Sequence, residues 1–142
     1  IMAACELGRR RQKSATPERQ RMDSAAAIYE YYAGLRDKGT EEFHLLMLNN
    51  ACEVIAEKCM SQGGLTQSVV DIRLVMREAL IAQATAIAVC HNHPSGRCQP
   101  SNEDKRLTQM LDQAAQTLCI RLLDHVIVTD GDYYSFHDEG LL

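Results

Sequence analysis

The sequence has no tryptophan and only two phenylalanines among its 142 residues. An aromatic platform for stacking nucleic-acid bases is therefore not expected. Apolar runs long enough to span a membrane are also missing, so no membrane contact is expected. There are no internal repeats and no low-complexity tracts. The whole chain is 46% hydrophobic and 24% charged, which is the ordinary composition of a folded domain of this length.

No pair of cysteines has the C-x-x-C spacing, which argues against a zinc knuckle and a thioredoxin motif. Most of the cysteines lie in apolar patterns and are interpreted as small core residues. This use of cysteine favours a reducing cytoplasm over a secreted disulfide framework. Cys98 is different because its loop looks exposed. The six cysteines are Cys5, Cys52, Cys59, Cys90, Cys98 and Cys119.

The net charge of −4 is unevenly distributed. Residues 1–38 hold eight Lys or Arg against five Asp or Glu, whereas the other 104 residues hold seven against fourteen. The basic cluster "GRRRQK" at 8–13 is interpreted as a solvated helix end, with a nucleic-acid contact as the alternative. Because the rest of the chain would repel a polyanion, we expect at most weak DNA contact from it. The sequence does not specify an oligomeric state.

The order of apolar patterns predicts an α/β or α+β fold, with helices packed on a mixed sheet. Residues 1–22 are expected to be a helical remnant and linker of a truncated upstream segment, and 23–142 the main domain. Helices are predicted at 23–39, 71–84 and 101–119, with Asp71 as an N-cap. Strands are predicted at 43–48, 52–60 and 85–91, followed by two strands within 120–136 that are joined by Asp130-Gly131.

The stretch "CHNHPSGRCQPSNED" carries the most specific chemistry in the chain. It follows a buried strand, and in an extended chain the side chains of His91 and His93 point to the same side. Pro94 would end the strand, and Ser101 would open a helix with Asp104 in its first turn. Two imidazoles and one carboxylate make a three-ligand zinc set that leaves a fourth position for water. Such a metal lowers the pKa of the water toward about 7.

Each part of this stretch also has a plain structural interpretation. Ser101 and Asp104 resemble a capping box in which Asp replaces the usual Glu or Gln. His91 and His93 could be surface residues at a strand end. The combination of His-x-His, a turn and a capped acidic residue is what favours a metal site.

In this spacing the chain resembles the JAMM (MPN+) metalloprotease motif: His-x-His, seven residues, Ser, two residues, Asp. With "LLDHVIV" and "YYSFHDEG" downstream, it is most similar to the bacterial RadC family over about residues 40–140. The resemblance implies a layered JAMM fold of the cytidine-deaminase-like type and a zinc-dependent (Zn²⁺) hydrolase that cleaves an amide bond of an unknown protein or peptide. His91, His93 and Asp104 are the implied metal ligands. Ser101 is expected to hold the substrate oxyanion or the zinc-bound water.

The motif also requires a glutamate well upstream as general base, and "EEFHLLMLN" offers Glu41 and Glu42. We choose Glu42 because in the family pattern the glutamate begins the strand and directly precedes its apolar residues. A general base must come within hydrogen-bond reach of the water, and a carboxylate entering a sheet edge near the histidines could do so. One departure is Asn92, where many JAMM peptidases carry Ser or Thr, although Asn fits the RadC branch.

Two other metal-dependent families do not fit the pattern. The letters "HNH" resemble the name of the HNH nucleases, but the histidines of those enzymes lie far apart in sequence. Zinc deaminases need His-x-Glu and a later Pro-Cys-x-x-Cys; this chain has His93 where the glutamate belongs, and it has no such cysteine pair. His44, His125 and His137 are interpreted as packing or surface residues, with His125 the best candidate for a minor role. The rival hypothesis is a JAMM fold kept as a non-enzymatic module, either for protein interaction or for association with DNA.

Overall fold

The computed structural model describes residues 17–63 and 70–142. The helix end expected within 1–13 and the basic cluster at 8–13 lie outside these residues. The described elements are α2 (Ala25–Tyr31), a 3₁₀ turn η1 (Ala33–Leu35), β1 (Glu42–Leu48), β2 (Val54–Gln62), α3 (Ile72–Ile81), β3 (Ala86–Asn92), α4 (Asn102–Thr117), β4 (Arg121–Thr129) and β5 (Asp132–Ser135).

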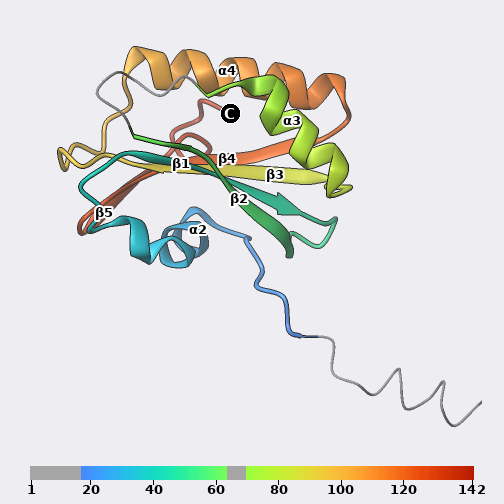
Figure 1. Ribbon diagram of the computed structural model, residues 1–142, viewed down its shortest axis with the longest axis horizontal. Coiled ribbons are helices and arrows are strands. Elements are labelled where there is room, and N and C mark those ends of the chain that lie inside the picture. The colour runs from blue at the N-terminus through green and yellow to red at the C-terminus, as the bar shows by residue number, and fades with distance from the viewer. Residues whose placement is uncertain (1–16, 64–69) are drawn as a thin grey trace, which may run out of the picture.

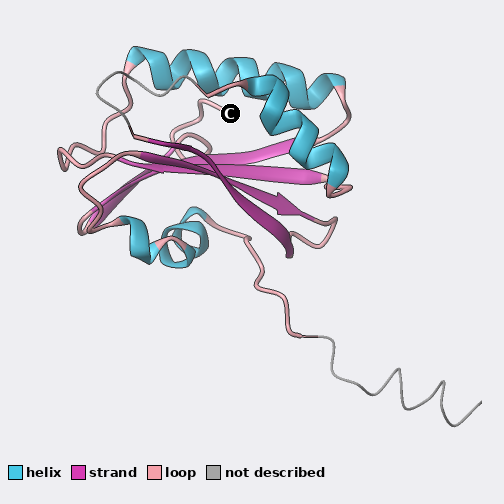
Figure 2. Cartoon of the chain, in the orientation of Figure 1, coloured by secondary structure: helices cyan, strands magenta, loops and turns pink. Residues whose placement is uncertain are grey.

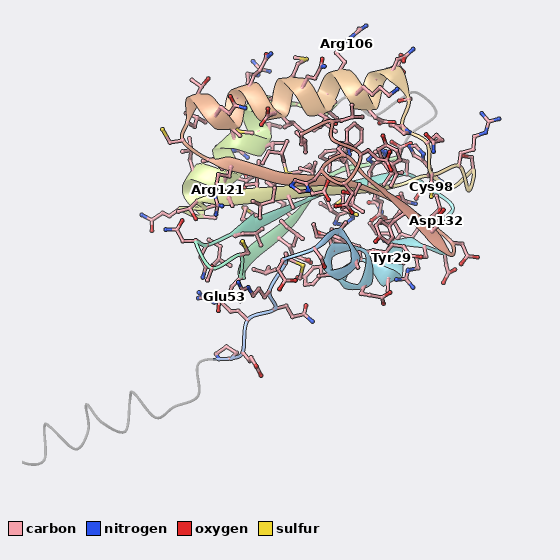
Figure 3. The ribbon with its side chains drawn as sticks, turned by 180° about the vertical axis from the view of Figure 1, so that it is seen from behind. Tyr29, Glu53, Cys98, Arg106, Arg121 and Asp132 are labelled. Carbon is pink, nitrogen blue, oxygen red and sulfur yellow. The ribbon has the colours of Figure 1, made fainter. Side chains whose placement is uncertain are left out.

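The five strands form one mixed sheet in the order β2-β1-β3-β4-β5. β3 and β4 are parallel, and the other neighbours are antiparallel. Helices α3 and α4 cover one face of the sheet, and α2 covers the other (Figures 1 and 2). In the reverse view, Arg106 on α4 and Tyr29 on α2 lie on opposite sides of the sheet (Figure 3). This arrangement confirms the α/β fold with a mixed, helix-flanked sheet.

Local sequence explains how the strands are connected. In the β1–β2 hairpin the side chain of Asn49 accepts hydrogen bonds from the backbone N–H groups of Ala51 and Glu53 at 2.9 and 3.0 Å, an Asx turn that reverses the chain. In the β4–β5 hairpin Gly131 has φ +88°, a conformation that glycine adopts without steric cost. The parallel pair β3–β4 needs a long crossover, and α4 provides it.

Alternation along the central strands creates two separate cores. Leu46, Leu48 and the even-numbered residues of β3 pack toward α2. Leu45, Met47 and the odd-numbered residues Ile87 and Val89 pack toward α3 and α4. β3 is buried along its whole length, as expected for a central strand with helices on both faces. The same alternation decides which polar residues at the strand ends face α4.

Two sequence-based expectations differ from the structure. The first helix is shorter than 23–39, because regular helix ends at Tyr31 and a 3₁₀ turn containing Gly34 follows; glycine is an unfavourable residue in a helix interior. The cysteines are also less buried than expected: of the five that the structure describes, only Cys90 is buried. Among the described helices, none has the length and hydropathy to cross a membrane.

Candidate metal centre

Three side chains from β3, the segment after it and α4 converge at one end of the sheet. His91 is in β3, His93 follows the strand, and Asp104 is in the first turn of α4. The Nε2 atoms of His91 and His93 are 2.9 Å apart. Asp104 Oδ1 lies 3.4 Å from His91 Nε2, and Asp104 Oδ2 lies 3.5 Å from His93 Nε2. The three residues thus form a group that could hold a metal ion.

The start of α4 holds the carboxylate in place. Ser101 and Asp104 form a capping box in which the Asp104 N–H donates to Ser101 Oγ at 3.1 Å and the Ser101 N–H donates to Asp104 Oδ2 at 2.7 Å. Ser101 Oγ also donates to Asp104 Oδ2 at 2.7 Å. The only hydroxyl hydrogen of Ser101 is therefore used to orient Asp104. In this arrangement it is not free for the oxyanion that the family resemblance assigned to it.

A chain of buried hydrogen bonds fixes the tautomer of His91. Thr108 Oγ1 lies 2.7 Å from the carbonyl oxygen of Asp104, and only the hydroxyl can donate in that pair. Since the hydroxyl has one hydrogen, Thr108 must accept from His125 Nδ1–H, 2.6 Å away. His125 Nε2 then has a free lone pair, which accepts from His91 Nδ1–H at 2.7 Å. His91 Nε2 is therefore left as a lone pair that points at His93 and Asp104.

His93 presents the same kind of lone pair. Its Nδ1 lies 2.7 Å from the carbonyl oxygen of Arg97 and must donate to it, so its Nε2 is the unprotonated nitrogen of the neutral ring. Two imidazole lone pairs and a carboxylate oxygen then face one another, and all three are groups that donate electron pairs to a metal ion. Two atoms bound at about 2.1 Å to one tetrahedral ion lie about 3.4 Å apart. The two nitrogen-to-oxygen separations, 3.4 and 3.5 Å, are close to this value and involve the two different oxygens of Asp104. The two histidine nitrogens, 2.9 Å apart, are closer together than such an ion would hold them.

The pKa values of these groups follow from their surroundings. Burial lowers the pKa of His91 to about 4 and keeps that of His125 well below its ordinary value. Contact with Asp104 raises the pKa of His93 despite partial burial. Burial works against ionisation of Asp104, but His93, His91 and Ser101 together hold the pKa of its carboxyl below the ordinary value. At neutral pH Asp104 is therefore ionised and His91 is neutral, which are the forms that bind a metal.

Asn92, between the two histidines, faces the other way and braces the segment before β1. Its Oδ1 accepts from the Glu42 N–H at 2.8 Å, and its Nδ2 donates to the carbonyl oxygens of Lys38 and Thr40 at 3.4 and 3.0 Å. The side chain is almost completely buried. All three bonds go to backbone atoms, so Asn92 ties the segment that carries Glu41 to the strand that carries the first ligand.

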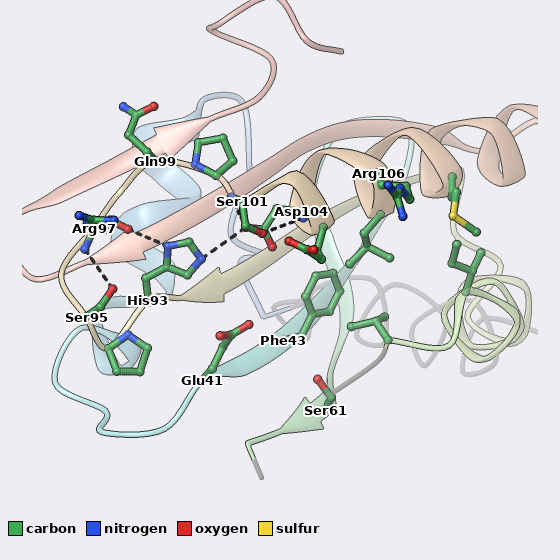
Figure 4. A pocket seen from close by; sticks show the side chains of 17 residues that line it. Glu41, Phe43, Ser61, His93, Ser95, Arg97, Gln99, Ser101, Asp104 and Arg106 are labelled. Atoms are coloured by element: carbon green, nitrogen blue, oxygen red, sulfur yellow. Dashed lines mark hydrogen bonds and ion pairs between the residues drawn. The ribbon is translucent and has the colours of Figure 1, made fainter. Parts of the chain in front are cut away.

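A pocket of about 720 Å³ opens beside two of the three candidate ligands, His93 and Asp104, a volume within the usual range for small-molecule sites. Glu41, His93, Ser101 and Asp104 line it (Figure 4), and Arg97 and Arg106 stand on its rim. Its apolar wall comes from β1, α4 and the segment leading into α3, namely Phe43, Val70, Ile72, Leu107 and Met110. Burial raises the pKa of Glu41, an effect that the nearby His93 opposes and Asp104 reinforces.

The structure does not bring Glu42 to this pocket. Phe43 pairs with His91 across β1 and β3, and paired residues project from the same face of a sheet. Alternation then puts Glu41 on the face of the ligands and Glu42 on the opposite face. There the carboxylate of Glu42 contacts Lys38, His44 and Gln62. The glutamate beside the candidate ligands is therefore Glu41, and not Glu42, which was chosen from the sequence.

Sequence reasoning also missed the part that His125 and Thr108 play. His125 was given only a minor role, and Thr108 was not singled out. The contact between His125 and His91 arises because β3 and β4 pair in parallel, with Val89 opposite His125. The sequence contains one signal of such a contact, the polar pair Asp124-His125 within an apolar strand. Polar side chains that are buried in this way need hydrogen-bond partners. The carboxylate of Asp124 indeed accepts from Ser135 Oγ at 2.6 Å and from the N–H groups of His125 and His137.

Comparison with known proteins gives a consistent family match. The family described as "RadC-like JAB domain" matches residues 22–141. A UPF0758 protein of Flavobacterium johnsoniae is 39% identical over 99% of this chain, and one of Porphyromonas gingivalis is 42% identical over 100% of this chain. The chain spans 62% and 63% of the length of these two relatives, respectively.

Proposed function

Because this chain belongs to the RadC-like JAB domain family, we propose that its metal centre is that of a zinc-dependent hydrolase that cleaves amide or isopeptide bonds. The observation that carries the proposal is the convergence of two imidazole lone pairs and one carboxylate oxygen beside a pocket that also holds Glu41. Nitrogen and oxygen donors of this kind, three in number, are typical of catalytic rather than structural zinc sites.

Zinc bound by His91, His93 and Asp104 supplies Lewis-acid chemistry: it makes water acidic enough to be deprotonated near neutral pH and it polarises a carbonyl group. Glu41 is the group that takes the proton of the attacking water and later delivers it to the leaving amine. Its raised pKa suits a carboxylate that must act first as a base and then as an acid. Ser101 acts through Asp104, because its hydroxyl and N–H both bind that carboxylate.

The pocket supports a protein or peptide segment as the substrate. Its apolar wall of Phe43, Leu107 and Met110 offers a surface for an aliphatic side chain next to the scissile bond. Arg97 and Arg106 at the rim are suited to a carboxylate or a backbone carbonyl of the same substrate. We place the hydrolase in the domain formed by residues 23–142.

The test is hydrolysis of a panel of fluorogenic peptide and lysyl-isopeptide amides by the zinc-loaded protein, before and after removal of the metal by chelator. Glu41→Gln should retain zinc and fold and lose about 10²–10⁴-fold in turnover, the usual contribution of a general acid–base. Glu42→Gln should retain most of the turnover, because its side chain lies on the other face of the sheet.

Three outcomes would count against the proposal. Turnover that survives chelation would separate the activity from the metal. A dead Glu42→Gln variant that still binds metal at His91, His93 and Asp104 would return the base to the residue that the sequence first indicated. Zinc bound by His91, His93 and Asp104 without cleavage of any amide in the panel would favour the non-enzymatic module.

A further inference from the structure

A second group of metal-binding side chains lies on the sheet face opposite the pocket. Glu42 and His44 alternate on β1 and so project from the same face. The register between β1 and β2 shifts after Phe43, so that Phe43 pairs with Ser61 but His44 pairs with Cys59. This bulge puts Cys59 directly across from His44. The possible ligand atoms of Glu42, His44 and Cys59 all lie within 4.8 Å of one another.

The carboxylate of Glu42 is held so that one oxygen is anchored and the other faces His44. Its Oε1 accepts from Lys38 Nζ at 2.7 Å and from Gln62 Nε2 at 2.9 Å, while its Oε2 lies 2.9 Å from His44 Nε2. The side chain of Glu42 is only 3% exposed. Contacts of this kind around a ligating carboxylate orient it, as the outer contacts of known metal sites do.

We propose that Glu42, His44 and Cys59 bind a second divalent transition-metal ion, of the zinc or cobalt class, in a site separate from the candidate hydrolytic centre. A thiolate together with an imidazole selects zinc-like ions over calcium and magnesium, which prefer oxygen donors. Cys59 is exposed, so an ion can reach the three ligands from solvent. The fourth position is open to water.

Two changes accompany binding. His44 shifts its hydrogen to Nδ1, and Cys59, whose sulfur now lies 3.3 Å from the Ser61 carbonyl oxygen, loses its proton to solvent. Partial desolvation of the sulfur and the nearby Glu42 carboxylate raise the pKa of the Cys59 thiol, so bound metal is needed to favour the thiolate at neutral pH. An ion held there would also join β1 to β2 directly next to Glu41, and so would stiffen the start of β1.

The sulfur ligand gives a spectroscopic test that is independent of the hydrolytic centre. Titration of the whole 142-residue chain with cobalt(II) should fill two sites per chain. One of them should show a near-ultraviolet thiolate-to-cobalt charge-transfer band, which the set His91, His93 and Asp104 cannot produce. Cys59→Ser should abolish this band and one equivalent of cobalt, and His44→Asn should weaken binding at the same site.

The controls separate the two sites. Cys5→Ser and Cys119→Ser should keep the band, because these cysteines are not in the proposed ligand set. His93→Asn should lose the cobalt bound at the hydrolytic centre and also keep the band. The test of the second site is therefore independent of the proposed hydrolase. A wild-type chain without the band, or a band that survives Cys59→Ser, would overturn the second site.

Discussion

Replacement of Thr108 by valine tests whether the buried chain from His91 through His125 sets the metal affinity. Valine has nearly the shape of threonine, so the change leaves no cavity but removes the hydroxyl that accepts from His125 Nδ1–H. His125 is completely buried, so water cannot take over. The His125 ring can then keep an unpaired Nδ1–H, or it can change tautomer, carry its hydrogen on Nε2 and donate to His91 Nδ1. The second choice forces the hydrogen of His91 onto the nitrogen that would bind metal.

The size of the effect follows from these two alternatives. An unsatisfied buried donor costs about 1–3 kcal/mol. The tautomer that leaves His91 Nε2 free for metal should therefore rise in free energy by about this amount, relative to the tautomer with hydrogen on that nitrogen. Outer-shell partners of ligating histidines typically change metal affinity by about 10–100-fold, which corresponds to about 1.4–2.7 kcal/mol. The two estimates agree, so we expect Thr108→Val to weaken zinc binding by about 10–100-fold while the fold is retained.

The assay is competition for zinc against a chelating dye at fixed pH, with nitrogen NMR of the imidazoles to report the tautomer of His91. Thr117→Val is the matched control: this threonine, on the same helix, also donates its hydroxyl to the carbonyl four residues earlier, but it is exposed. Thr108→Ser keeps a hydroxyl and should restore most of the affinity. Equal zinc affinity in Thr108→Val and Thr117→Val would refute the reasoning.

Two further predictions concern protonation and the helix cap. In the metal-free protein, burial holds the pKa of His91 at about 4, below the ordinary 6.5, so its stabilising contribution is complete above pH 6.5 and is lost as the pH falls toward 4. His93 has a raised pKa, so its stabilising contribution is complete below pH 6.5 and is lost as the pH rises through its raised pKa. NMR titration should show His91 gaining its proton near pH 4 and His93 still protonated above 6.5. The reverse order would contradict the geometry. Ser101→Ala should cost roughly 0.5–2 kcal/mol in urea unfolding as a lost cap, yet retain zinc, because the N–H of residue 101 still holds Asp104. Asp104→Ala should lose zinc, and equal zinc loss in both variants would mean that their roles are wrongly assigned.

Much of the fold could be predicted because local chemistry determines it. Asp71 caps α3 and Ser101 caps α4 as expected, since both side chains satisfy N–H groups of the helix starts. The strand predicted at 85–91 contains the apolar run 86–90, and β3 forms the buried centre of the sheet. The His-x-His spacing and the capped aspartate are also local features, so they correctly indicated which side chains would converge.

The remaining features depend on pairings between distant segments. The choice between Glu41 and Glu42 required the register of β1 against β3, and a register shifted by one residue reverses every side chain. His125 meets His91 only because β4 lies beside β3 in parallel. The bulge that brings Cys59 to His44 is likewise a property of the strand pair. In each case the residues are visible in the sequence, but their neighbours are not.

The capping box at the start of α4 has a consequence for how quickly and reversibly the candidate centre would exchange a metal ion. Three hydrogen bonds already join Asp104 to Ser101. His91 is positioned by His125, and His93 by the carbonyl oxygen of Arg97. The ligands therefore need no ion to hold their places, unlike those of zinc fingers, which fold only when metal binds. Exchange should then be limited by dissociation of the ion itself and not by refolding. If the proposed zinc binds there, the centre would lose and regain it without unfolding as the supply of free zinc changes.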